Sequence, residues 1–152
     1  RIGRGFSNNR YRGYYKRIAD IPGVKLVPVE TQSYHLIDRS RAVATITGSA
    51  AWEAVLRGKP AMIFGYPWFQ DLSGLLKIRG VESCKEAIGR IQAGFAVDEQ
   101  SVLRYLLCLG RVSIRGFCSP INGKYSGLTK QESMHNITQE LIKELKTSTV
   151  WT

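Results

Sequence analysis

One short segment near the middle of the chain combines hydroxyl groups, a glycine and a carboxylate at spacings that suit a phosphorylated ligand. Thr47, Gly48 and Ser49 follow an apolar, β-branched run, and Glu53 follows Ser49 by four positions. Glycine lets the backbone approach a ligand closely, and unpaired N–H groups at the start of a helix favour a phosphate. Because Thr47 and Ser49 can add hydroxyl donors, the turn formed by Thr47, Gly48 and Ser49 is a candidate phosphate site.

Glu53 is expected one turn into the helix that begins at this segment. Four residues of helix rise about 6 Å, and the ribose of a nucleotide lies at a comparable distance from its phosphates. The Glu53 carboxylate could therefore accept hydrogen bonds from both ribose hydroxyls. The alternative is that Glu53 only favours the positive end of the helix dipole. A capping box does not explain Glu53, because that motif requires Ser or Thr three positions earlier, where Ala50 stands.

Short apolar runs, with glycine and proline between them, predict alternating strands and helices around this segment. Strands are expected at residues 24–27, 42–47 and 61–64. Helices are expected at residues 9–19, 34–40, 50–57, 83–93, 99–110 and 130–146. Ser33 is a candidate N-cap, Gly58 a helix stop, residues 66–76 a loop and residues 115–127 irregular. The alternation predicts an α/β fold with a parallel sheet, in which ligands bind at the carboxyl ends of strands.

The composition fits one domain spanning residues 1–152, with no apolar run long enough to cross a bilayer. Three cysteines without a CxxC pair and only two histidines disfavour a disulfide framework and a metal site. They indicate reduced thiols and a cytoplasmic setting. Since no acidic DxD pair occurs either, the sequence predicts no cofactor and no essential divalent ion.

The formal charge of +10 favours an anionic partner. Residues 1–17 are rich in basic and aromatic side chains and resemble an RNA-binding tail. The helical spacing of their apolar positions instead favours a packed helix with its cations in solvent. Residues 1–10 are expected to be flexible. Nucleic acid is therefore the less favoured partner, and the anionic inner-membrane surface is an alternative. Arg12, Lys16 and Lys59 are candidate contacts for the phosphate or sugar groups of a ligand, with solvated cations as the competing interpretation.

Residues 33–65 match the pattern SxxLIxxxxxVxTITGSxxWEAxxxGKPxxxFG. In this block the chain resembles the capsule polysaccharide biosynthesis proteins, bacterial glycosyltransferases of the GT-B type, several of which transfer Kdo from CMP-Kdo. The likeness continues in YYKRIADIPGVKLVP upstream and in FGYPWFQD, GFAVDE and KYSGLT downstream. A shorter core of Gly-Ser, EA and GKP is shared with UDP-N-acetylglucosamine 2-epimerases, so an epimerase-like fragment is the alternative.

The resemblance implies a Rossmann-like three-layer domain, the C-terminal half of a GT-B fold, followed by C-terminal helices. It also implies a nucleotide-sugar donor, with CMP-Kdo among the candidates, whose phosphates lie at residues 47–50 and whose ribose lies on Glu53. The polysaccharide or glycolipid acceptor, and usually the catalytic base, would belong to an N-terminal domain outside this chain. This domain alone is therefore expected to bind donor without turnover. One departure is Tyr34, where the family often has a histidine.

Overall fold

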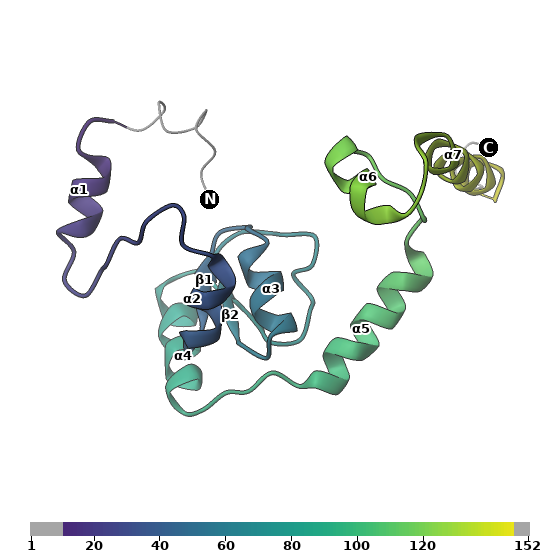
Figure 1. Cartoon of the computed structure of the whole chain (residues 1–152). Helices are drawn as coiled ribbons and strands as arrows, with labels where there is room; N and C mark the ends of the chain where they lie inside the picture. Colours follow the sequence, from purple (N-terminus) through teal and green to yellow (C-terminus); the bar gives the residue numbers. More distant parts are fainter. Residues whose placement is uncertain (1–10, 148–152) are drawn as a thin grey trace. The chain divides into compact units, whose positions relative to one another are not determined.

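A computed structural model describes residues 11–147, without the side chains of residues 120 and 121. The expected flexible segment at residues 1–10 lies outside the described residues. Two compact units divide the chain, one extending to Val102 and the other beginning at Leu103 (Figure 1). Each unit is described by itself. The single domain predicted for residues 1–152 stays a prediction.

The N-terminal unit contains a parallel sheet of three short strands. They are β1 (Val43–Thr45), β2 (Ala61–Ile63) and β3 (Leu75–Lys77), in the order β1-β2-β3. Figure 1 labels β1 and β2. Val43 pairs with Ala61, and Ala61 in turn pairs with Leu75. The predicted α/β class with a parallel sheet is therefore confirmed. The prediction that all of residues 66–76 form a loop is wrong, because the start of β3 falls within them.

Helices cover both faces of this sheet. On one face, α2 (Ser33–Arg39) and α3 (Ala50–Leu56) pack against the fully buried side chains of Ala61 and Ile63. On the other face, Met62 packs with β3 against Ala87 of α4 (Val81–Gln92). Successive residues of β2 point to opposite faces, as the pleat of a strand requires. The result is a helix–sheet–helix arrangement compatible with a Rossmann-like domain.

The predicted strand at residues 24–27 is wrong. This segment follows α1 (Tyr14–Ala19) and has no strand assignment, and Val24, Leu26 and Val27 are all exposed. Within residues 11–147, no strand or core face covers the side chains of this segment. Their preference for β-structure therefore does not produce a strand. Helix α2 begins one residue earlier than predicted, at Ser33. The N-cap is therefore Gln32 and not Ser33, and the Gln32 side chain makes no capping hydrogen bond.

The C-terminal unit is helical. It comprises most of α5 (Glu99–Val112), with α6 (Pro120–Ser126) and α7 (Lys130–Thr147). The prediction that residues 115–127 are irregular is therefore wrong for α6. A reciprocal capping box starts α7: the Thr129 N–H donates to Glu132 Oε2 at 2.7 Å, and the Glu132 N–H donates to Thr129 Oγ1 at 3.2 Å. The Thr129 N–H and the Thr129 hydroxyl both donate to the Glu132 carboxylate, and these two bonds lower the pKa of Glu132.

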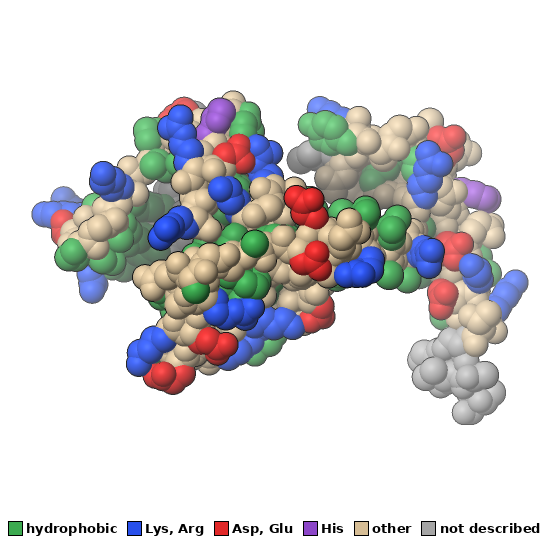
Figure 2. Space-filling model, turned by 90° about the horizontal axis from the view of Figure 1, so that it is seen from below, with side chains coloured by type: hydrophobic (Ala, Val, Ile, Leu, Met, Phe, Trp, Pro, Cys, Tyr) green, Lys and Arg blue, Asp and Glu red, His purple; other side chains and the backbone are tan. Residues whose placement is uncertain are grey.

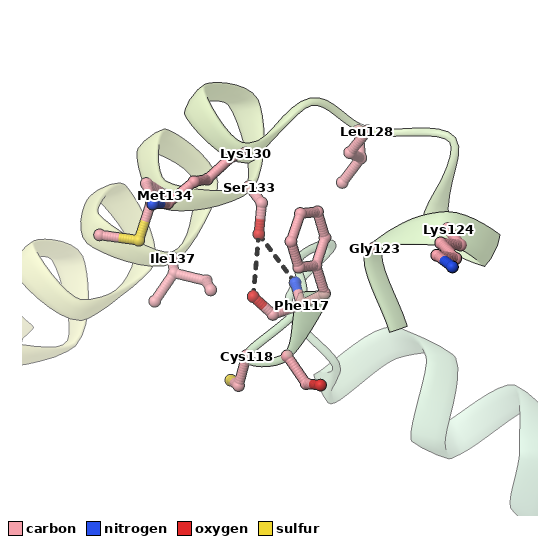
Figure 3. Close-up of a pocket in the computed structure, with 10 residues that line it drawn as sticks. Phe117, Cys118, Gly123, Lys124, Leu128, Lys130, Ser133, Met134 and Ile137 are labelled. Atoms are coloured by element: carbon pink, nitrogen blue, oxygen red, sulfur yellow. Dashed lines mark hydrogen bonds between the residues drawn. The ribbon is translucent and has the colours of Figure 1, made fainter. Parts of the chain in front are cut away.

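In the C-terminal unit, a buried serine joins α7 to the segment before α6. Ser133 is 1% exposed. Its hydroxyl accepts from the Phe117 N–H at 2.8 Å and donates to the Phe117 carbonyl at 3.2 Å (Figure 3). No helix within the described residues has the length and apolar character needed to cross a membrane.

Candidate functional site

The turn predicted to bind phosphate lies at the carboxyl end of β1, between that strand and α3. The Gly48 N–H donates to Thr45 Oγ1 at 3.2 Å, and a Cβ at Gly48 would lie 2.8 Å from that oxygen. Thr47, Gly48 and Ser49 are exposed. Among the described residues, no acceptor contacts the backbone N–H of Ser49 or Ala50. The turn therefore presents amide donors at the surface.

Glu53 lies beside this turn, and its two carboxylate oxygens face two serines. Ser49 Oγ donates to Oε1 at 3.1 Å, and Ser33 Oγ donates to Oε2 at 3.4 Å. The side chains of α2 and α3 thus meet at a half-buried carboxylate. The Ser33 hydroxyl therefore donates a hydrogen bond to Glu53 and does not cap α2. We call Ser33, Thr47, Gly48, Ser49 and Glu53 the carboxyl-edge site.

An ion pair at the far end of α3 holds that helix against α2. Arg57 donates from Nε and Nη2 to the two carboxylate oxygens of Asp38, at 2.6 and 2.5 Å. This bond lowers the pKa of Asp38 and raises that of Arg57. Ile37, beside Asp38, is buried in the same core as Ala51 and Ala54 of α3. Core and ion pair together fix the alignment of the two helices, and so bring Ser33 to Glu53.

The end of β2 packs closely against the turn. The Gly65 N–H donates to the Ile46 carbonyl at 2.8 Å. A Cβ at Gly65 would lie 2.6 Å from Thr47 Cγ2 and 3.0 Å from the Ile46 oxygen. Real Cβ atoms essentially never lie 2.6 Å from another heavy atom, so any side chain at position 65 would require Thr47 to shift.

Arg79, which follows β3, also belongs to this edge. Its Nη1 donates to the carbonyls of Gly65 and Ile78, at 3.2 and 3.0 Å. The guanidinium carbon lies 4.1 Å from the centre of the Tyr66 ring. Sequence reasoning missed Arg79 because it missed β3. The sequence did contain a signal for this residue, because Arg79 is a cation placed between a short, largely apolar run and Gly80.

The other predicted contacts lie elsewhere. Lys59 precedes β2, at the amino-end edge of the sheet, where its charge contributes to the lowered pKa of Asp38. Arg12 and Lys16 are exposed, and no interaction joins them to the carboxyl-edge site within the part of the chain that is described. The structure therefore brings together the turn and Glu53, but not the three predicted cations.

The C-terminal unit has an open groove of its own, of about 740 Å³. Apolar side chains from the start of α7 and from the Phe117 segment line this groove, and two lysines, Lys124 and Lys130, line it as well (Figure 3). None of the predicted site residues lines this groove. Across the described residues, no group of three or more His, Cys, Asp or Glu side chains could hold a metal ion. Figure 2 shows Lys and Arg side chains spread over both units, with Asp and Glu among them.

The chain is an α/β protein with a parallel sheet, and hydroxyl groups and a carboxylate gather at the carboxyl edge of that sheet. In open sheets of this class, ligands commonly bind where the strands end. The chain belongs to the capsule polysaccharide biosynthesis protein family, whose model matches residues 4–104. That match includes the whole sheet and the complete carboxyl-edge site, and it supports a role in capsule synthesis. No match was found among curated proteins or among solved structures.

Proposed function

We propose that this chain contains the donor-binding domain of a glycosyltransferase that builds capsule or another surface polysaccharide. The observation that carries the proposal is the Glu53 carboxylate, held between two serine hydroxyls beside an exposed turn in a member of the capsule family. The ligand is a nucleotide-sugar, with CMP-Kdo among the candidates. Its acceptor is a polysaccharide or glycolipid bound outside this domain.

The proposed roles follow from hydrogen-bonding capacity. An ionised carboxylate only accepts hydrogen bonds, so Glu53 suits the two hydroxyl donors of a ribose. The contacts from Ser49 and Ser33, at 3.1 and 3.4 Å, are longer than the usual 2.7–2.8 Å or so for such bonds. Ribose hydroxyls can therefore replace them at small cost.

The phosphate groups would then bind the 47–50 turn. The N–H groups of Ser49 and Ala50, which contact no acceptor among the described residues, and the hydroxyl of the exposed Thr47 are donors there. During transfer, negative charge develops on the phosphate of the leaving nucleotide, and fixed donors stabilise it. This arrangement does not require a metal ion, and the catalytic base would come from outside the domain.

Calorimetric titration with CMP, CDP, UDP and GDP tests the proposal. We expect at least one of these nucleotides to bind the wild-type protein, and Glu53→Ala to weaken that binding. Glu82→Ala is the matched control, because Glu82 also lies in the first turn of a helix, α4, and shares the dipole effect. Equal affinities for the two variants would refute the ribose role of Glu53.

A further inference from the structure

We propose that Arg79 binds an anionic group of the donor, either its phosphate or the carboxylate of an acidic sugar. The inference rests on the proposed nucleotide-sugar site and extends that site across the sheet. Arg79 follows β3, and β3 is separated from β1 by one strand. Two strand spacings amount to about 10 Å, so Arg79 lies on the same edge as the turn, beyond β2.

Gly65 links the arginine to the turn. Its carbonyl accepts from Arg79 Nη1 at 3.2 Å, and its N–H donates at 2.8 Å to the carbonyl of Ile46, the residue before Thr47. A Cβ at Gly65 would lie only 2.6 Å from Thr47 Cγ2. The guanidinium and the turn therefore contact the same residue from two sides. A ligand anion held on the exposed turn comes close to Arg79.

The contacts of Arg79 hold its position without neutralising its charge. Two backbone carbonyls occupy Nη1, and the Tyr66 ring lies against the guanidinium. In the described chain, no carboxylate forms an ion pair with Arg79. Arg57 is different, because Asp38 satisfies it in a bidentate pair.

The free part of the guanidinium suits an oxyanion. Arginine has five N–H donors, and those on Nε and Nη2 contact no acceptor among the described residues. Paired N–H donors on a planar guanidinium match the geometry of phosphate and carboxylate oxygens. An exposed arginine that is oriented in advance loses less side-chain entropy when such an anion binds. Arg79 is therefore a ready-made anion contact at this edge.

Titration of Arg79→Gln and Arg79→Lys tests the inference. The probes are CMP, CDP, UDP and GDP, each with its free nucleoside. We expect Arg79→Gln to lower affinity for the nucleotide that binds best by roughly tenfold, with less than a twofold change for its nucleoside. Arg79→Lys should fall between, since it keeps the charge and loses the planar fork. Arg90→Gln is the matched control, because Arg90 lies over the Phe95 ring at 4.4 Å on α4.

A second pair of probes, UDP-glucose and UDP-glucuronate, separates the two anions. A loss shared by CDP, UDP and both UDP-sugars assigns Arg79 to phosphate, whereas a loss confined to UDP-glucuronate assigns it to the sugar carboxylate. Either pattern supports the inference. If the wild-type protein binds nucleotides, and Arg79→Gln is indistinguishable from Arg90→Gln for every nucleotide and for both UDP-sugars, the inference is overturned and the proposed function stands. Failure of the wild-type protein to bind any probe overturns both.

Discussion

Replacing Glu53 by Gln gives the sharpest test of how the carboxyl-edge site works. The substitution keeps the size and shape of the side chain and removes its charge. A hydrogen bond to a charged group contributes about 1.5–3 kcal/mol. Glu53 is only half-buried and already has two serine hydroxyls nearby. We therefore expect the lower part of this range, about 1.5–2 kcal/mol, or a 10- to 30-fold loss of affinity.

A thermodynamic cycle isolates the ribose contact. The tightest ligand among CMP, UMP and GMP is titrated against wild type and Glu53→Gln, together with its 2′-deoxy counterpart. The wild-type protein should prefer the ribonucleotide by about 10-fold or more, and the variant should nearly lose that preference, because the missing hydroxyl and the missing charge belong to one interaction. Equal discrimination by both proteins would show that Glu53 does not contact ribose, even if the variant binds all nucleotides more weakly.

Three further predictions concern the parts that support the site and the C-terminal unit. Gly65→Ala should weaken nucleotide binding in calorimetry because its Cβ would displace the turn, whereas Gly110→Ala, where no atom lies within 4 Å of the added Cβ, should not. Ser133→Ala should lower the free energy of unfolding of the C-terminal unit by about 1–3 kcal/mol in urea titrations, because both polar groups of the Phe117 backbone lose their partner; an unchanged midpoint would contradict this. The pKa of Glu132 is lowered from its ordinary 4.5, so its stabilising effect is complete above that pH and is lost as pH falls through the folded-state value. The protection of the α7 amides from hydrogen exchange, relative to the intrinsic rate at each pH, should fall below about pH 4.5 in the wild-type protein, and Glu132→Gln should remove that pH dependence.

The helices that were predicted well are those whose sequence signals lie within or next to the helix itself. The helix predicted at residues 50–57 is α3, Ala50–Leu56, and Gly58 follows it with a φ of +72°. Apolar spacing, a glycine stop and the turn before it are all readable within a dozen residues. The same holds for α7, predicted at 130–146 and observed at Lys130–Thr147. A helix satisfies its own backbone, so neighbouring residues are enough to indicate it.

The strand errors have the opposite cause. Residues 24–27 are the more β-like run, yet they remain unpaired and exposed. Leu75–Lys77 has a weaker pattern and becomes β3 because it pairs with β2 through Met62 and Leu76. A strand exists only through hydrogen bonds to a neighbour, and the sequence of the strand itself does not name that neighbour.

The same distinction between local and long-range features applies to the candidate site. Residue types and spacing alone identified the 47–50 turn and placed Glu53 one helical turn beyond it, since both depend on contiguous backbone geometry. Only the tertiary structure decided that Ser33, 20 positions earlier, meets Glu53, that Lys59 lies at the opposite edge, and that Arg79 joins the turn through Gly65. Packing between helices and pairing between strands set those neighbours, and both act between residues far apart in the chain.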